Sequence, residues 1–515
     1  MRRQATAVFF LVLCLVLTRD TIARADTTPI SGPVYEIFVP SFRDSNGDGL
    51  GDLNGIKDSL PYLASLNVEA LWLTPIHPSP SYHHYDVLDY MDIDPAFGSL
   101  ADFEALKAAC GREGIRLLLD LVINHTSSEH PWFVSACGTL AASAGGQEKG
   151  GDHPAGVSLN PYIGYYNFTL GSGQYPVPNA EGWFYQSSFG PHMPDLNLDS
   201  ELVREEIAGI VAYWLSLGAD GFRLDGVVHY YEENTAKNTA FLRWFNQEVK
   251  ALRPDATLVG EAWKDSATIL SLYESGVDSF FNFPFSGSEG WLMKAIRAQD
   301  GQSLAQKTSK WQNQVRAKYP GAADAPFLSN HDTGRSAGFL RMDPQAQKQA
   351  AAIYLLLPGI PFVYYGEEIG MTGSGRDENK RLPMLWSSTQ AAGMCLPPAG
   401  ADQTQRLKTG VSEQEGDPDS LLSFYRGILT LRDRIPELAR GEVTPIDPGH
   451  KSLMAYRVRE NGQSALIIHN LKEETLTVSV TWPETWLGAW DTGLGMPVIT
   501  NGALTLPPKS GAAFY

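Results

Sequence analysis

Short apolar segments recur along most of the chain, and a helix-like stretch follows nearly every one of them. Eight of these segments are rich in β-branched and aromatic residues and predict strands: Val34–Phe38, Ala70–Leu73, Leu117–Val122, Gly221–Leu224, Thr257–Val259, Ser279–Phe281, Pro326–Leu328 and Pro361–Tyr364. Three longer stretches between them have the i, i+3, i+4 apolar spacing of amphipathic helices: Leu100–Ala109, Val203–Leu217 and Asn238–Leu252. Eight strand–helix units over about 400 residues predict an α/β fold, a (β/α)8 TIM barrel with insertions, rather than an open doubly wound sheet.

Two parts of the chain depart from this alternation. Residues 126–195 are rich in Gly, Ser, Pro, Asn and Tyr, which predicts a domain inserted after the third strand. Residues 437–515 contain short alternating segments that predict an antiparallel β-sandwich domain, namely Ser452–Val458, Ser464–His469, Leu476–Trp482 and Ala512–Tyr515. The barrel is then expected to consist of residues 26–125 and 196–436.

The first 25 residues predict a secretory signal peptide. Arg2 and Arg3 precede an apolar run from Ala7 to Leu17, and Ala23-Arg24-Ala25 is a small-x-small cleavage site. The competing interpretation is a retained membrane anchor, but the apolar run is about half the ~20 residues that span a bilayer. We therefore expect a secreted protein, extracellular or periplasmic, with no membrane association after cleavage behind Ala25.

Composition and charge exclude several classes. Of the 515 residues, 43% are hydrophobic and 19% are charged, which is ordinary for a globular protein and excludes disorder for the bulk of the chain. The 40 Lys and Arg against 58 Asp and Glu give a formal charge of -18, which would repel a phosphate backbone, so no nucleic acid partner is expected. Cleavage of the signal would leave Cys110, Cys137 and Cys395, an odd number that permits at most one disulfide.

Charged residues follow several of the expected barrel strands directly. The third, fourth, fifth and seventh strands run into polar segments at Asn124-His125, Arg223-Leu224-Asp225, Glu261 and His331-Asp332. Burying such charges is unfavourable unless they pair or act on a ligand. Active sites of these barrels lie at the C-terminal ends of the strands, so the carboxylates Asp225, Glu261 and Asp332 are candidate catalytic groups.

These segments resemble the motifs of the α-amylase superfamily of glycoside hydrolases (family 13), in the order and at the intervals of that family. The resemblance extends from about Val34 to the C-terminus. It implies a barrel (domain A), the inserted domain B and a C-terminal domain C. It also implies hydrolysis of α-glucosidic bonds with retention of configuration, through a covalent glycosyl-enzyme intermediate.

The resemblance implies a role for each charged residue. Asp225 would be the nucleophile, Glu261 the general acid/base and Asp332 the transition-state stabiliser. Arg223 lies two residues before Asp225, on the same face of the strand, and is expected to keep that carboxylate ionised with a depressed pKa. Glu261, next to apolar Ala262 and near other carboxylates, is expected to have a raised pKa.

Sugar-binding residues are implied in the same way. His125 and His331 match the histidine pair that binds hydroxyls of the sugar at the cleavage point. Residues 81–86 resemble the substrate-binding loop after strand two, where Tyr85 would stack on that sugar, and His84 stands where the family usually has Gly. The implied substrate-binding set is His83, Tyr85, Asp86, His125, Arg223 and His331.

Two Ca2+ sites are expected. The first loop offers oxygen ligands at the spacing of the first part of an EF-hand loop: Asp44, Asn46, Asp48, the Leu50 carbonyl and Asp52. Its twelfth position is Gly55 instead of the usual Glu, and an Asx-rich turn without metal is the alternative. The second site rests on the resemblance alone, which implies Asn124, Asp195 and the carbonyl of His229 as ligands.

The segment Met193–Asn197 resembles family members intermediate between oligo-1,6-glucosidases and neopullulanases, and export favours a large substrate. We predict a monomeric, endo-acting α-amylase that cleaves α-1,4 bonds of an α-glucan, starch or maltooligosaccharides. The alternatives are a cyclomaltodextrinase or neopullulanase, an oligo-1,6-glucosidase and a glucanotransferase. A non-catalytic carbohydrate-binding barrel would differ in class, and such proteins typically lack one of the three carboxylates.

Two further groups have both a functional and a structural interpretation. Aromatic residues of the insertion either line additional glucose subsites or form local core: Trp132, Tyr162, Tyr165, Trp183 and Tyr185. Arg376, Asp377 and Arg381 either face the cleft or form a surface salt-bridge group.

Overall fold

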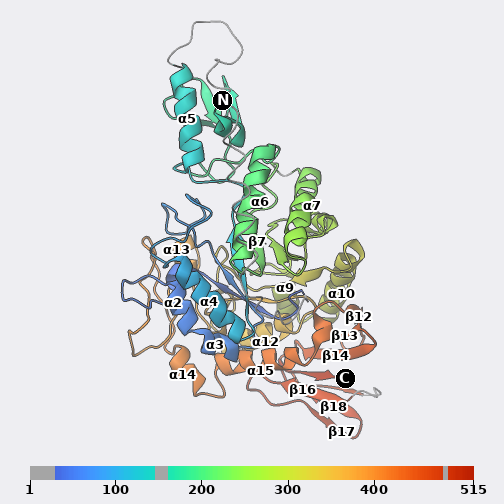
Figure 1. Cartoon of the computed structure of the whole chain (residues 1–515). Helices are drawn as coiled ribbons and strands as arrows, with labels where there is room; N and C mark the ends of the chain where they lie inside the picture. Colours follow the sequence, from blue (N-terminus) through green and yellow to red (C-terminus); the bar gives the residue numbers. More distant parts are fainter. Residues whose placement is uncertain (1–28, 145–159, 233, 480–484) are drawn as a thin grey trace.

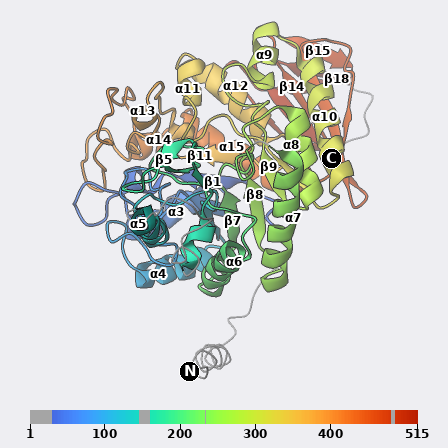
Figure 2. The same cartoon turned by 90° about the horizontal axis from the view of Figure 1, so that it is seen from above.

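The computed structural model describes residues 29–144, 160–232, 234–479 and 485–515. Its central element is a parallel sheet whose strands follow one another around a ring: β1 (Val34–Ile37), β2 (Ala70–Leu73), β3 (Arg116–Leu121), β7 (Gly221–Leu224), β8 (Thr257–Gly260), β9 (Ser279–Phe281), β10 (Ala323–Ala325) and β11 (Phe362–Tyr364). β1 pairs with β11, and a Phe327–Phe362 bridge closes the ring beside β10. Seen from above, the strands occupy the middle and the helices surround them (Figure 2). The predicted (β/α)8 barrel is confirmed.

The seventh barrel strand lies earlier than its apolar pattern indicated. The prediction was Pro326–Leu328, whereas β10 is Ala323–Ala325. Asp324, the central residue of this strand, interrupts the apolar pattern by which the other strands were predicted. In the structure Asp324 is buried and accepts hydrogen bonds from Trp311 Nε1 and Asn282 Nδ2, each at 2.8 Å. The other barrel strands agree with the prediction to within about one residue at each end.

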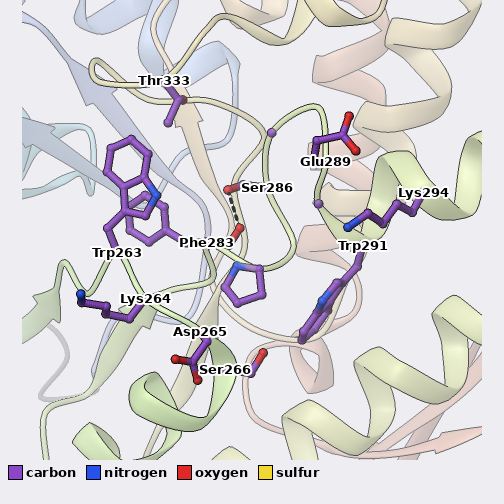
Figure 3. A pocket seen from close by; sticks show the side chains of 13 residues that line it. Trp263, Lys264, Asp265, Ser266, Phe283, Ser286, Glu289, Trp291, Lys294 and Thr333 are labelled. Carbon is purple, nitrogen blue, oxygen red and sulfur yellow. Dashed lines mark hydrogen bonds between the residues drawn. The ribbon is translucent and has the colours of Figure 1, made fainter. Parts of the chain in front are cut away.

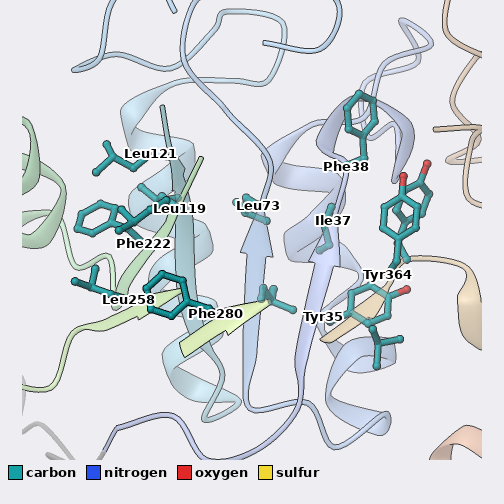
Figure 4. Packing of buried hydrophobic residues seen from close by; sticks show 14 of the residues in the cluster. Tyr35, Ile37, Phe38, Leu73, Leu119, Leu121, Phe222, Leu258, Phe280 and Tyr364 are labelled. Atoms are coloured by element: carbon teal, nitrogen blue, oxygen red, sulfur yellow. The ribbon is translucent and has the colours of Figure 1, made fainter. Parts of the chain in front are cut away.

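Strand alternation divides the barrel core into two layers. Side chains such as Val34, Trp72 and Leu118 fill the interior of the ring. Their neighbours face outward and pack against the helices, as Ile37 and Leu73 do in Figure 4. The helices of this outer layer include α2 (Leu53–Asp58), α3 (Leu60–Ser65), α4 (Leu100–Arg112), α6 (Glu201–Ser216), α7 (Thr235–Leu252), α8 (Ser266–Leu272), α10 (Gly301–Lys318), α12 (Pro344–Leu355) and α15 (Leu421–Asp433).

The same alternation places charged residues inside the barrel. Glu36 and Asp120 each lie between two outward-facing apolar neighbours on their strands, and Arg223 lies between Phe222 and Leu224. Because successive side chains point to opposite faces of a strand, all three charged side chains point inward. The interior therefore has an apolar layer and a charged layer.

The inserted segment forms a small unit beside one end of the barrel (Figure 1). It contains α5 (Pro131–Ala144) and an antiparallel sheet in the order β4 (Phe168–Leu170), β6 (Trp183–Tyr185), β5 (Tyr175–Pro176). Tyr165, Trp183 and Tyr185 are buried, and Trp132 packs edge-on against Tyr165 at 5.1 Å. These aromatic side chains form local core, so the subsite interpretation is wrong for the buried three.

The C-terminal region is a sandwich of two antiparallel sheets. One contains β12 (Glu442–Pro445), β13 (Leu453–Glu460), β14 (Gln463–Asn470), β19 (Gly511–Phe514) and β16 (Trp486–Trp490), and the other β15 (Leu476–Ser479), β18 (Ala503–Leu506) and β17 (Val498–Thr500). Leu453 and Ile468 of the first sheet share one cluster with Val478 and Leu504 of the second. The Tyr456 hydroxyl donates to the Leu356 carbonyl at 2.6 Å and ties the sandwich to the barrel.

Several sequence predictions concern features other than the barrel, the insertion and the C-terminal sandwich. The predicted signal peptide, residues 1–25, lies outside the described residues, as do the last residues of the Leu476–Trp482 prediction. Cys110, Cys137 and Cys395 are buried and free. In the part of the chain that the structure describes, no helix is both long and apolar enough to cross a bilayer.

Candidate active site

The guanidinium of Arg223, on β7, is the centre of the charged layer. Its Nη1 donates to Asp225 Oδ1 and to Asp120 Oδ1, each at 2.8 Å, and its Nη2 lies 2.7 Å from Glu261 Oε2. Asp120 and Arg223 are direct neighbours in the β3–β7 register, and Glu261 follows β8 immediately. One buried cation therefore holds carboxylates from three consecutive barrel strands.

A second cationic centre surrounds His331, after β10. Its Nδ1 lies 2.6 Å from Glu36 Oε1 on β1, and its Nε2 lies 2.7 Å from the Tyr85 hydroxyl and 3.1 Å from Asp332 Oδ2. Ionised carboxylates only accept hydrogen bonds, so a ring with a carboxylate at each nitrogen carries both protons. His331 is therefore an imidazolium. Arg381 completes this centre, with Nη2 at 2.7 Å from Asp332 Oδ1.

One hydrogen-bond chain joins the two centres. The Tyr85 hydroxyl donates to Asp120 Oδ2 at 2.9 Å and accepts from the His331 ring, while Asp120 accepts from Arg223. The side chains of Arg223, His331 and Asp120 have no exposed area, whereas those of Asp225, Glu261 and Asp332 are 11%, 10% and 32% exposed. The three candidate carboxylates thus present an accessible edge, and their partners form the buried support behind it.

Burial governs the pKa values of two of these carboxylates. It raises the pKa of Asp225 above its ordinary value, with Arg223 opposing and Asp332 adding to the rise. The expectation of a depressed pKa for Asp225 is wrong, because the pairing with Arg223 was visible in the sequence and the depth of burial was not. Burial also raises the pKa of Glu261, against Arg223 and with help from Asp225 and Asp332, as expected.

Asp332 and His331 shift each other in opposite directions. Although burial opposes it, the His331 imidazolium and then Arg381 hold the pKa of Asp332 well below its usual range. Burial likewise disfavours the charged form of His331, but Asp332 and then Glu36 raise the pKa of His331 to about 10. Asp332 is therefore the carboxylate most firmly held in its ionised form.

The loop expected to bind sugar is tied to these centres. The Tyr85 ring stacks on the His331 ring, with centroids 5.4 Å apart and planes 9° apart, and Tyr85 is 9% exposed. His83 Nδ1 lies 3.1 Å from Ser81 Oγ, and Asp86 Oδ1 accepts from Ser79 Oγ at 2.7 Å. His84 has a φ of 63°, a left-handed conformation in which glycine is usual. Its Nδ1 contacts the His77 carbonyl at 3.1 Å, which holds this backbone.

Two residues of the second calcium prediction, Asn124 and Asp195, are in direct contact. Asn124 Nδ2 donates to Asp195 Oδ1 at 2.9 Å, and a backbone bridge joins His125 to Asp195. His125 Nε2 lies 3.1 Å from the Tyr85 carbonyl, and the His125 and Phe189 rings are 5.0 Å apart. The His229 ring contacts the same Phe189, at 4.9 Å.

The first loop has the donor chemistry for a hard cation. Asp44 accepts backbone N–H bonds from Asn46 at 3.0 Å and Gly49 at 2.8 Å, and Asp52 caps α2 through the Gly55 amide at 2.7 Å. In the described ranges no three acidic, His or Cys side chains are gathered as for a metal. The loop thus offers oxygen donors, and calcium binding there stays a prediction.

The sequence did not predict two members of the buried support, and for a third, Arg381, it left two interpretations open. Glu36 and Asp120 received no role, although each is a charged residue within a strand that is otherwise apolar. A charged residue within an apolar strand indicates that its side chain is paired with another buried charge, so the sequence contained a sign of both roles. For Arg381 the cleft interpretation is right, since it pairs with Asp332, whereas Arg376 is 64% exposed and pairs with Asp402 at the surface.

Comparison with known proteins identifies the class. The catalytic-domain model of the α-amylase family matches residues 36–441, and the chain belongs to this family 13 of glycoside hydrolases. A relative named α-amylase 3 from Dictyoglomus thermophilum is 37% identical, over 85% of this chain and 84% of its own. An oligo-1,6-glucosidase from Heyndrickxia coagulans is 28% identical over 94% and 98%. The solved structure of Amy13B from Eubacterium rectale superimposes with a TM-score of 0.88 at 38% identity, over 95% and 96%.

The charge on His331 leads to a direct test. We expect the His331 ring to titrate near pH 10, and Glu36→Gln to lower this pKa by roughly 1–3 pH units, because one flanking negative charge is lost. The corresponding stabilisation of the fold is full below about pH 6.5 and is lost as the pH rises through about 10. The measurement is NMR titration of the histidine ring protons.

Glu368→Gln is the matched control. Glu368 is also buried, but it accepts a hydrogen bond from the Tyr35 hydroxyl at 2.6 Å, on the opposite face of β1 from Glu36. The His331 titration should stay unchanged in this variant. A His331 pKa near the ordinary value of about 6.5 in the unaltered protein would contradict the charged-ring assignment.

Proposed function

We propose that this glycoside hydrolase is an endo-acting α-amylase that cleaves α-1,4-glucosidic bonds of starch and maltooligosaccharides with retention of configuration. The observation that carries the proposal is the meeting of Asp225, Glu261 and Asp332, each with an accessible edge, around Arg223 and His331. Retaining cleavage of a glycosidic bond requires a nucleophilic carboxylate, a protonated carboxyl group and negative charge near the anomeric carbon. Arg223 orients Asp225, the raised pKa of Glu261 favours its protonated form, and Asp332 is held ionised.

In the first step, Asp225 attacks the anomeric carbon and Glu261 donates its proton to the glycosidic oxygen. The bond from carbon to the leaving oxygen breaks, the leaving sugar departs with that proton, and a glucosyl ester of Asp225 remains. Arg223 Nη1 at 2.8 Å from Asp225 Oδ1 orients the nucleophile. The raised pKa of Glu261 keeps a larger share of that carboxyl protonated, as the acid role requires.

In the second step, Glu261 removes a proton from water, and the resulting oxygen attacks the same carbon. The ester bond to Asp225 breaks, free Asp225 carboxylate returns, and the product keeps its α configuration. Asp332, held ionised by His331 and Arg381, supplies negative charge to the oxocarbenium-like transition state of both steps. A sugar hydroxyl in place of water would give transfer instead of hydrolysis with the same residues.

The choice among family activities is supported by similarity. The relative named α-amylase is 37% identical to this chain, and the oligo-1,6-glucosidase is 28% identical. Oligo-1,6-glucosidase activity is the second candidate, because that relative matches nearly the full length of both chains. We also propose that residues 1–25 direct export and that the enzyme acts as a monomer on an extracellular or periplasmic α-glucan.

Calcium is part of the proposal. Ca2+ would be held by oxygen atoms of Asp44, Asn46, Asp48, Leu50 and Asp52, and a second ion by Asn124, Asp195 and His229. When bound, it would supply charge neutralisation and rigidity to loops beside the barrel, and the catalytic steps above do not involve it.

The substrate test compares products from soluble starch, pullulan, cyclodextrin and isomaltose. We expect rapid loss of starch viscosity and a mixture of maltooligosaccharides that are initially α-anomers, with rates on isomaltose at least about tenfold lower. The lower rate follows if the α-1,4 linkage fits the transition state better than α-1,6. Faster hydrolysis of isomaltose than of starch would overturn the α-amylase assignment in favour of the second candidate.

Site variants serve as the controls of this assay. Asp225→Asn and Glu261→Gln should lower turnover on starch by about three or more orders of magnitude while thermal unfolding stays cooperative. Asp324→Asn alters another buried carboxylate, which bonds Trp311 and Asn282 outside the site, and should retain turnover. Near-normal rates in the Asp225 or Glu261 variant would refute the assigned roles.

The calcium proposal is tested by thermal unfolding. Chelation should lower the midpoint by roughly 2–8 °C, because a ligand that binds only the folded state stabilises it. Asp44→Asn should reduce this difference by the share of the first ion, and Asp58→Asn, an exposed change on the adjacent helix, should preserve it. Equal midpoints of thermal unfolding with and without chelator in the unaltered protein would contradict the calcium proposal.

A further inference from the structure

The loop that carries the candidate stabiliser Asp332 borders an open space. Thr333, the next residue, lines a cavity of about 520 Å3 whose lining also includes Trp263 and Phe283 (Figure 3). The Asp332 side chain is itself 32% exposed. Residues that border a cavity lack packing contacts on that side. The position of this loop therefore depends on contacts that it makes elsewhere.

The Arg381 guanidinium supplies several of these contacts. Its Nη2 lies 2.7 Å from Asp332 Oδ1, and its Nε donates to the His331 carbonyl at 3.1 Å. Its Nη1 donates to the Tyr82 hydroxyl at 2.8 Å. One guanidinium thus bonds both the carboxylate of Asp332 and the backbone just before it. Where Arg381 lies therefore determines where that carboxylate lies.

The backbone around Arg381 belongs to no long element. Arg381 directly follows α13 (Asp377–Lys380), a single turn of helix, and residues 382–385 are neither helix nor strand. Backbone groups outside regular elements must find their hydrogen bonds in side chains or solvent. The partners of the Lys380 and Leu382 carbonyls, on either side of Arg381, therefore fix this segment.

Both carbonyls accept hydrogen bonds from buried side chains of the barrel. Arg335 Nε donates to the Lys380 carbonyl at 2.8 Å, and the Tyr364 hydroxyl donates to it at 3.1 Å. The Tyr365 hydroxyl donates to the Leu382 carbonyl at 2.6 Å. The segment is thus bonded immediately before and immediately after its functional residue. We call the three donors, Arg335, Tyr364 and Tyr365, the clamp.

The clamp residues also hold one another. The Arg335 guanidinium lies over both aromatic rings, 4.2 Å from the centroid of Tyr364 and 4.6 Å from that of Tyr365. Its Nη1 donates to the Tyr365 carbonyl at 2.6 Å, and its backbone amide donates to the Gly373 carbonyl at 2.9 Å. All three side chains are buried. Their mutual contacts leave the clamp little freedom to move.

The clamp joins the two parts of the chain that meet at Asp332. Arg335 is three residues after Asp332 in the loop that follows β10, whereas Tyr364 is the last residue of β11 and Tyr365 comes next. We propose that the clamp positions Arg381, and through Arg381 the carboxylate of Asp332, for stabilisation of the transition state. The clamp residues do this without touching the substrate. The inference rests on the proposed function and adds three positioning residues to it.

The test begins with the kinetics of Arg335→Met on soluble starch. This variant removes the bond to the Lys380 carbonyl and the charge over both tyrosine rings. We expect kcat to fall roughly ten- to a hundredfold while KM stays within about twofold. The reason is that a displaced stabiliser weakens binding of the transition state more than binding of the substrate.

Arg432→Met is the matched control. Arg432 is also a buried arginine that donates to backbone carbonyls, those of Leu355 and Leu357 at 2.6 and 2.8 Å. These carbonyls lie between the end of α12 and β11 rather than beside Arg381. The control variant should therefore lose thermal stability but keep kcat.

A smaller change covers the case in which Arg335→Met fails to fold. Tyr365→Phe removes only the hydroxyl that bonds the Leu382 carbonyl and should lower kcat about three- to tenfold. Its control is Tyr456→Phe, which removes another buried hydroxyl that donates to a carbonyl at 2.6 Å, that of Leu356. This control should leave kcat unchanged.

A double-mutant cycle separates positioning from general destabilisation. If the clamp acts through Arg381, Tyr365→Phe should lower kcat by less than about 1.5-fold in the Arg381→Met background. Losses that multiply in the double variant, or an unchanged kcat in Tyr365→Phe alone, would overturn the inference while the proposed function stands. An unaltered enzyme that does not cleave starch would overturn both.

Discussion

The site depends on one buried cation that holds three carboxylates. The Arg223 guanidinium contacts Asp120, Asp225 and Glu261, and its side chain has no exposed area. Burying a charge without partners is prohibitive, and removing one partner of a buried pair typically costs about 3–5 kcal/mol. The register of β3, β7 and β8 supplies these partners. The strand pairing that builds the barrel therefore also brings the charged groups of the active site together.

The charge count around this cation suits the proposed chemistry. With every group ionised, Asp120, Asp225, Glu261, Asp332 and Glu36 face only three cations, Arg223, His331 and Arg381. A buried site with this negative excess retains a proton readily, and burial raises the pKa of Asp120 to about 7. The same excess favours a transition state that develops positive charge at the anomeric carbon.

Much of this arrangement could be predicted from the sequence. Asp225, Glu261 and Asp332 stand out because each follows an apolar strand, and the two-residue spacing predicts the contact from Arg223 to Asp225. Asp120 and Glu36 were missed because a charge inside a strand has no visible partner until neighbouring strands are aligned. The pKa direction of Asp225 was wrong because burial depth is a property of the assembled barrel.

The most direct measurement is covalent trapping of the intermediate. Incubation with a fluorinated α-glucosyl fluoride, which forms the glycosyl-enzyme faster than water can cleave it, should add one sugar per chain by intact-protein mass spectrometry. Peptide mapping should place that sugar on Asp225, and the Asp225→Asn variant should acquire none. A label on any other residue, or turnover with inversion and no label, would contradict the account of Arg223 and Asp225 as the centre of catalysis.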